Sequence, residues 1–240
     1  GGFFGGWLDR EMVATMSAVR CSAEVAFVGF YIVDPEIRGK GYGKYLWDEV
    51  LSRYPGMTFG ADSVPDQVAS YETDGFSVAY GNARYSGSAL PGPDENGPTL
   101  TPAGSVDFDA LVEFDGRHCF GPRPDFLRPW IEGPGREALV ATDESGGITG
   151  FAASRMSSGG TRIGPVFAGG QGTARSLILE LAERAGGRVA VDVPLPNQPA
   201  VELLESLGME QGFETARIYR GPAPELPLAE IFGVTSLELG

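Results

Sequence analysis

The feature that most constrains the fold is an internal repeat. An offset of 133 residues (208 − 75) places Gly75-Phe76 on Gly208-Met209 without a gap. The same offset pairs further residues of like type, namely Tyr80 with Phe213, Ala83-Arg84 with Ala216-Arg217, Leu46 with Leu179 and Val33 with Val166. One or two such pairs arise by chance, but an ungapped register with shared hydrophobic patterns indicates a duplication. We therefore expect two copies of one structural unit.

The hydrophobic pattern of the first copy mixes strands and helices. Short apolar runs rich in Val, Ile and Phe predict strands over Phe3–Leu8, Met12–Cys21, Val25–Val33, Met57–Ala61 and Ser77–Tyr85. Leu46, Val50 and Leu51 recur on one helical face after Gly43. A shorter helix is expected from about Pro65 to Asp74. Together these elements predict an α+β fold.

A proline-rich segment separates the two copies. Residues Pro91–Pro102 read PGPDENGPTLTP, with four prolines, two glycines and one leucine. That composition buries little apolar surface and suits a linker. We expect a first domain over residues 1–88, a linker over 89–104 and a second domain over 105–240. The chain opens without a methionine, which fits a first domain that lacks its N-terminal part.

Composition excludes several classes of function. The 32 acidic residues against 18 basic ones give a net charge of −14, which repels phosphate backbones and anionic lipid. We therefore expect neither nucleic acid nor a membrane as partner, and no apolar run approaches the ~20 residues of a membrane span. His118 is the single histidine, and Cys21 and Cys119 match no metal-ligand spacing. These features predict a cytoplasmic protein without a metal site.

The strongest local signal is the loop from Arg38 to Gly43, between a buried strand and a helix. Alternate glycines let backbone N–H groups approach an anion closely, and the helix adds its positive N-terminal end. Arg38 and Lys40 add positive charge in an acidic chain. The loop is neither a Walker A motif nor a G-x-G-x-x-G fingerprint. It predicts a pyrophosphate site, against the alternative of a plain glycine-rich turn.

Two segments carry a family resemblance. Val33–Gly43, with the sequence VDPEIRGKGYG, resembles the R/Q-x-x-G-x-G/A motif of the GNAT acyl-CoA-dependent N-acetyltransferases, and Tyr71–Phe76 resembles their Y-x-x-x-G-F signature. The resemblance covers roughly residues 1–87 and, through the repeat, the second copy, whose ending Ile231–Gly240 is similar to I-F-G-V-T-S-x-E-x-G. It implies two tandem GNAT-like α+β units, each a mixed, mostly antiparallel twisted sheet flanked by helices.

The resemblance also implies a cosubstrate, acetyl-CoA, and residues that hold it. The pyrophosphate would lie on the loop residues Arg38, Gly39, Lys40, Gly41, Tyr42 and Gly43. The strand edge near Ile32 and Val33 would pair with the pantetheine arm and polarise the thioester carbonyl. Tyr71 matches the tyrosine that protonates the departing thiolate, although an aromatic residue at this helical position also suits simple core packing.

The general base is left open. Glu24, at the start of the Val25–Val33 strand, resembles the position used by some family members, and Asp62, at the end of the following strand, is the rival. Each also suits an ordinary solvated carboxylate at a strand end. Val64 replaces an asparagine that often contacts the coenzyme in this family.

The repeat predicts that the two copies differ in function. The offset pairs Gly41 with Ala174, Gly43 with Ser176 and Tyr71 with Leu204. A Cβ obstructs close backbone approach, and leucine has no proton to donate. We expect a degenerate second copy and one coenzyme site, although Gly169-Gly170 leaves room for a rearranged loop.

These inferences together predict an acetyl-CoA-dependent N-acetyltransferase acting on a primary amine by direct attack. The expected partner is a small-molecule amine. The oligomeric state is left open, with a homodimer as one arrangement. The alternative from another class is a non-catalytic acyl-CoA-binding sensor or scaffold. A third reading is the transfer of a longer acyl or an aminoacyl group.

Overall fold

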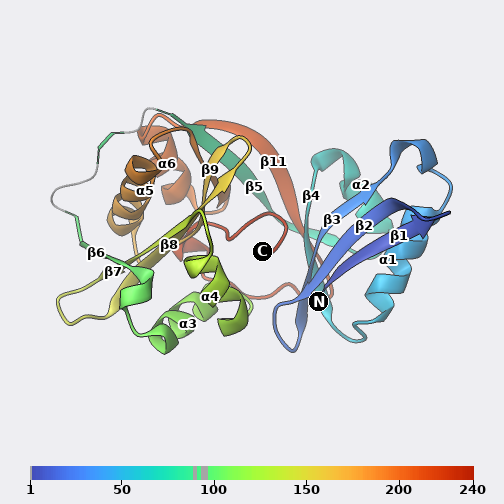
Figure 1. Cartoon of the computed structure of the whole chain (residues 1–240), viewed down its shortest axis with the longest axis horizontal. Helices are drawn as coiled ribbons and strands as arrows, with labels where there is room; N and C mark the ends of the chain where they lie inside the picture. The colour runs from blue at the N-terminus through green and yellow to red at the C-terminus, as the bar shows by residue number, and fades with distance from the viewer. Residues whose placement is uncertain (1, 89–90, 93–96) are drawn as a thin grey trace. The chain divides into compact units, whose positions relative to one another are not determined.

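The computed structural model describes residues 2–88, 91–92 and 97–240, which form two compact units (Figure 1). Unit 1 runs to Ala79 and also contains Ala216–Pro224 and Leu237–Gly240. Unit 2 comprises Tyr80–Thr215 and Glu225–Ser236. Two segments from the end of the sequence therefore complete unit 1. The boundaries that the sequence predicted for the first domain, the linker and the second domain remain a prediction.

The sheet of unit 1 has the order β1-β2-β3-β4-β11. Its strands are β1 (Phe3–Leu8), β2 (Glu11–Arg20), β3 (Val25–Val33), β4 (Thr58–Ser63) and the end of β11 (Glu210–Arg220). Only β3 and β4 are parallel, and Ala216–Arg220 of β11 pairs antiparallel with Phe59–Ser63. The sheet is thus mixed and mostly antiparallel.

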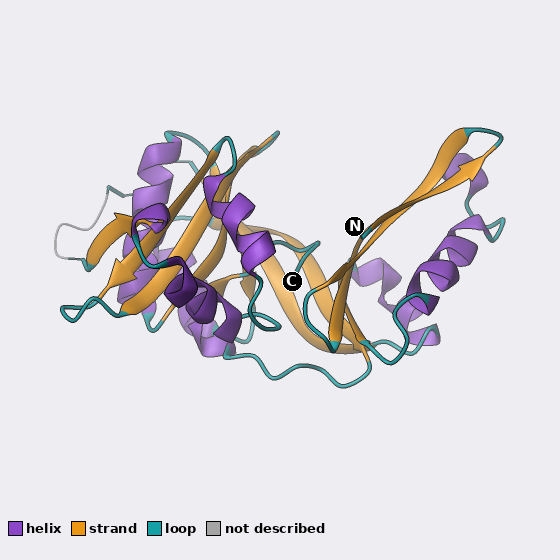
Figure 2. Cartoon of the chain, turned by 60° about the horizontal axis from the view of Figure 1, so that its bottom comes forward, coloured by secondary structure: helices purple, strands orange, loops and turns teal. Residues whose placement is uncertain are grey.

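One longer helix supports this sheet. Helix α1 (Tyr42–Ser52) packs on β1 and β2, and Figures 1 and 2 show it alongside these strands. Its buried face, led by Leu46, Trp47 and Val50, joins Met16 and Phe59 in one hydrophobic core. The shorter elements are the 3₁₀ turns η1 (Pro35–Ile37) and η2 (Pro65–Gln67) and helix α2 (Val68–Thr73).

Unit 2 has a sheet of the same mixed kind, in the order β5-β10-β9-β8-β7-β6, with β12 paired to β9. The strands are β5 (Ser77–Gly87), β6 (Thr99–Pro102), β7 (Arg136–Thr142), β8 (Ile148–Ser157), β9 (Gly160–Ala168), β10 (Val189–Pro194) and β12 (Ile231–Gly233). Among the described strands of this unit, the pair β9 and β10 is parallel and the other pairs are antiparallel.

Helices cover both faces of the unit 2 sheet (Figures 1 and 2). Helices α5 (Gln171–Ala185) and α6 (Gln198–Ser206) cover one face, and α3 (Phe108–Arg117) and α4 (Pro124–Glu132) the other. The turns η3 (Ala103–Ser105) and η4 (Leu228–Glu230) complete the unit. No helix in the described part of the chain combines the length and apolar character needed to span a membrane.

The structure confirms the α+β fold in two tandem units. Strands β5 and β11 obey the repeat offset to the residue, since 77 + 133 = 210 and 87 + 133 = 220. Within the expected linker, Thr99–Pro102 forms β6 on the edge of β7. The alternating residues Thr-Leu-Thr form this strand, but the surrounding prolines made the segment resemble a linker. Residues 89, 90 and 93–96 of that linker lie outside the described residues.

Candidate functional site

The parallel strands of unit 1 diverge halfway along β3. Val25–Val28 pairs with Thr58–Ala61, and among the described residues of β4 none pairs with β3 beyond Val28. A bulge marks the divergence, since the β2–β3 register shifts between Thr15 and Ser17 and Phe30 has a positive φ of 49°. We call the gap between Gly29–Val33 and the end of β4 the unit 1 fork.

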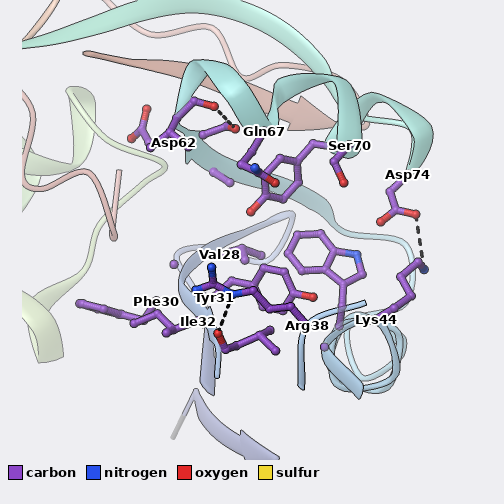
Figure 3. Close-up of a pocket in the computed structure, with 18 of the residues that line it drawn as sticks. Val28, Phe30, Tyr31, Ile32, Arg38, Lys44, Asp62, Gln67, Ser70 and Asp74 are labelled. Carbon is purple, nitrogen blue, oxygen red and sulfur yellow. Dashed lines mark hydrogen bonds and ion pairs between the residues drawn. The ribbon is translucent and has the colours of Figure 1, made fainter. Parts of the chain in front are cut away.

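A pocket of about 930 Å³ occupies this fork, and all of its lining residues belong to unit 1. Figure 3 shows Val28, Tyr31 and Ile32 of β3 on one side and Gln67 and Ser70 on the other. The lining also includes Val33, Arg38, Gly39, Gly41, Gly43, Asp62 and Tyr71. The structure therefore brings most of the sequence-predicted site residues together. Lys40, Tyr42 and Glu24 are exposed and do not line the pocket.

The glycine loop lies at the start of α1. Gly39 and Gly41 have φ values of +75° and +87°, and a Cβ on either would meet no atom within 4 Å. These are left-handed conformations with open space above them, as a backbone cradle for an anion requires. Gly41 is also the N-cap of α1, so the first N–H groups of the helix add donors without intrahelical partners.

Gly43 serves a different purpose. A Cβ there would lie 2.6 Å from Val33 Cγ2 and 2.7 Å from the Tyr31 hydroxyl. The glycine therefore allows α1 to pack closely on β3, which fixes the helix N-terminus beside the fork.

Two cationic side chains line the pocket (Figure 3). Arg38 Nε donates to the Val33 carbonyl at 3.0 Å, which ties the loop to the end of β3. Lys44 Nζ pairs with Asp48 and, at 3.4 Å, with Asp74. The hydrogen bond to Asp48 is the main reason that the Lys44 pKa is raised, so this side chain stays charged. Sequence reasoning missed Lys44, whose only signal is its place in the first turn after the glycine loop.

Aromatic rings form one wall of the pocket. Trp47 lies between Tyr31 and Tyr71, with ring centroids 5.1 and 5.4 Å away, and Phe76 lies 5.7 Å from Tyr71. Burial raises the pKa of Tyr71 to about 12, with Tyr31 and Asp74 adding to the effect. The Tyr71 hydroxyl therefore keeps its proton at neutral pH. Tyr31 also lines the pocket and was not singled out from the sequence, because its signal is that of an ordinary strand aromatic.

The two carboxylates expected as bases lie in different places. Asp62 has a fully buried side chain and accepts two hydrogen bonds from Arg217 of β11, at 3.1 and 2.8 Å. This ion pair anchors β11 to β4, which is a structural role. Glu24 is exposed just before β3, at the opposite end of that strand from the fork. Val64 does line the pocket, where it offers no side-chain hydrogen bond.

The corresponding place in unit 2 is occupied by the chain itself. Strands β9 and β10 pair only over Thr161–Ile163, and β12 then pairs with Val166 and Phe167. A Cβ on Gly233 of β12 would lie 2.8 Å from Val191 Cγ1 of β10 and 3.1 Å from Val166 Cγ2 of β9. Strand β12 therefore fills the gap between the diverging strands β9 and β10, which we call the unit 2 fork.

The loop of the second copy is also changed. Helix α5 begins at Gln171, after the N-cap Gly170, so Ala174 lies inside the helix, where it is fully buried. Leu204, the counterpart of Tyr71, is fully buried in the core of unit 2. An added helical turn thus replaces the glycine loop.

His118 is a packing residue of unit 2. It is buried, stacks on Phe167 and contacts the Phe114 carbonyl at 2.8 Å and the Glu230 carboxylate at 2.9 Å. Both ring nitrogens are engaged within the unit.

Comparisons with known proteins agree with this architecture. The profile of the "Acetyltransferase (GNAT) domain" matches residues 111–233, and that of the "Acetyltransferase (GNAT) family" matches residues 1–71. The holothin acyltransferase of Pseudoalteromonas sp. (strain SANK 73390) is 32% identical over 100% of this chain and 81% of its own length.

Solved structures show the same fold. A putative acetyltransferase from Pyrococcus horikoshii superposes with a TM-score of 0.84 at 20% identity, covering 100% of this chain and 80% of its own. A tandem GNAT protein from the clavulanic acid biosynthesis pathway gives a TM-score of 0.63 at 19% identity, covering 91% and 82%. With both units matched by family profiles and one relative above 30% identity over the whole of this chain, the chain belongs to the GNAT acetyltransferase family.

Proposed function

We propose that the fork pocket of unit 1 binds acetyl-CoA and transfers its acetyl group to the primary amine of a small molecule. The observation that carries this proposal is the continuity of one surface. The open backbone edge of Gly29–Val33 leads to a left-handed glycine loop and then to the N-terminus of α1. An extended amide chain that ends in a pyrophosphate matches such a surface.

The loop and strand supply complementary contacts. The N–H groups from Gly39 to Gly43 bind the pyrophosphate, with Arg38 and Lys44 as cations that line the pocket. Lys40 and Tyr42, exposed on the same loop, contact the coenzyme from outside the lining. Backbone groups of Ile32 and Val33 pair with the pantetheine arm in the manner of an added strand. A backbone N–H of this edge polarises the thioester carbonyl and stabilises the oxyanion of the tetrahedral intermediate.

Tyr71 assists the leaving group. A phenol with a pKa of about 12 is a weaker acid than a thiol, whose reference value is about 8.5. Full proton transfer to the thiolate is therefore uphill, and Tyr71 acts mainly as an O–H donor that stabilises the sulfur as the C–S bond breaks. Its raised pKa keeps that donor protonated.

The acceptor class is suggested by a relative. That protein is named for acyl transfer to holothin, and this chain covers 81% of it at 32% identity. We therefore propose a small-molecule amino group as acceptor, attacking directly while both substrates are held together.

The proposal is tested by thiol release. The chain is mixed with acetyl-CoA and a panel of small primary amines, and free thiol is followed with a chromogenic disulfide while mass spectrometry identifies the amide. Amine-dependent release with a product heavier by one acetyl group is expected. Binding of acetyl-CoA without release on any amine would instead favour a non-catalytic acyl-CoA sensor. Turnover only with longer acyl or aminoacyl donors would redefine the donor.

A further inference from the structure

The end of the chain lies against the bulged part of β3. Leu237–Gly240 belongs to unit 1, and a Cβ on Gly29 would lie 2.7 Å from the carbonyl oxygen of Glu238 and 3.1 Å from its Cα. The φ of Gly29 lies outside the left-handed region, so this glycine is required by the close approach and not by its own conformation. The contact places Glu238 beside Gly29, where β3 and β4 begin to diverge.

Three acidic residues belong to the lining of the fork pocket, namely Asp62, Asp74 and Glu238. Asp62 is buried in its ion pair with Arg217, and Asp74 pairs with Lys44 at 3.4 Å. Glu238 is half-buried and reaches the pocket from a separate segment, beside the β3 edge where the thioester is proposed to lie.

We propose that Glu238 is the general base of the transfer reaction, taking a proton from the ammonium form of the acceptor before attack. This inference rests on the proposed function. It replaces Glu24 and Asp62 as the base, and it assigns the acceptor class as primary amines that are protonated at neutral pH. A carboxylate at this place both attracts the cation and accepts its proton.

The step balances without another reactant. One proton passes from the ammonium nitrogen to Glu238, and the nitrogen lone pair then forms the C–N bond to the acyl carbon. The electron pair of the C–S bond leaves with the sulfur, to which Tyr71 donates a hydrogen bond. As the intermediate collapses, the nitrogen gives up its second proton and the thiolate takes up one proton, while the proton on Glu238 passes to solvent. The products are therefore an amide, a free thiol and the one proton that the ammonium brought.

The test compares Glu238→Gln with the wild-type chain on an accepted amine whose pKa is about 8, as for an α-amino group. At about pH 6.5 the variant should lose on the order of 100-fold or more in kcat/KM, the range for a general base. At about pH 9.5 the amine is already neutral, and the defect should shrink to a few-fold. Glu238→Asp should retain more activity than Glu238→Gln, and Glu225→Gln, an exposed change outside the pocket, should match the wild type.

A second variant guards against a merely structural effect. Gly29→Ala pushes on the Glu238 backbone and should reduce kcat/KM. The double variant Gly29→Ala/Glu238→Gln should be no less active than the less active of the two single variants, because both changes act through the same carboxylate. Titration calorimetry with acetyl-CoA should give the wild-type affinity for Glu238→Gln. A loss that is equal at both pH values, or no loss, overturns the inference while leaving the transferase intact. A wild-type chain that acetylates no amine overturns the proposed function itself.

Discussion

At the residue scale, the fork pocket depends on four glycines, which are required for two different reasons. Gly39 and Gly41 adopt left-handed backbone with open space around them, which leaves room for a ligand to approach the backbone. Gly43 and Gly29 instead admit close neighbours, α1 in one case and the chain end in the other. The first pair was predictable from local spacing. The role of Gly29 was not, because the residue that it contacts lies 209 positions later (238 − 29).

Tyr71→Phe tests the leaving-group assignment at the same scale. The ring packing on Trp47 and Phe76 is kept, and only the O–H donor is lost. A hydrogen bond to a charged group contributes about 1.5–3 kcal/mol, so kcat should fall about 10- to 100-fold with little change in KM.

The pH profile gives this variant a second readout. Activity needs the protonated phenol, and a folded-state pKa of about 12 means that the proton is lost only as the pH rises toward that value. The wild-type kcat should therefore hold its plateau through about pH 10, the ordinary tyrosine value. An alkaline fall near that pH that disappears in Tyr71→Phe would show that the hydroxyl titrates normally and would refute the assignment.

At the element scale, the two units share a pair of diverging parallel strands and use it differently. In unit 1 the fork beyond Val28 is a pocket, whereas in unit 2 β12 fills the fork beyond Ile163. The sequence predicted the strands and helices of the first copy well because their hydrophobic periods are local. It did not predict β12, since three residues, Ile-Phe-Gly, carry no period of their own.

Gly233→Ala tests whether β12 stabilises unit 2 by packing between β9 and β10. The new Cβ would lie 2.8 Å from Val191 Cγ1, and overpacking of this kind typically costs about 1–3 kcal/mol. The urea midpoint of unit 2 should fall accordingly, while the affinity for acetyl-CoA stays at the wild-type value. Gly187→Ala, at an exposed position with room for a methyl group, serves as the control and should leave the midpoint unchanged. A gain or loss of coenzyme binding in Gly233→Ala would mean that the unit 2 fork is a ligand site.

At the scale of the whole molecule, the two copies of the repeat differ at the fork, which holds a pocket in unit 1 and β12 in unit 2. The repeat offset pointed to a difference between the copies, because Gly41, Gly43 and Tyr71 are paired with Ala174, Ser176 and Leu204. It did not predict that Ala216–Pro224 and Leu237–Gly240 complete unit 1. Strand pairing over such distances in sequence is set by tertiary packing, which local patterns do not record. For the same reason the sequence offered Glu24 and Asp62 as bases and passed over Glu238.

The most direct test of this account is calorimetric titration of acetyl-CoA into the intact chain and two matched N-cap variants. Gly41→Val forces a β-branched residue into a left-handed conformation at the start of α1, whereas Gly170→Val alters an extended residue with open space at the start of α5. A stoichiometry near one, lost in Gly41→Val and kept in Gly170→Val, is the expected result. A stoichiometry near two, or binding that survives in Gly41→Val and disappears in Gly170→Val, would contradict a single coenzyme site in unit 1.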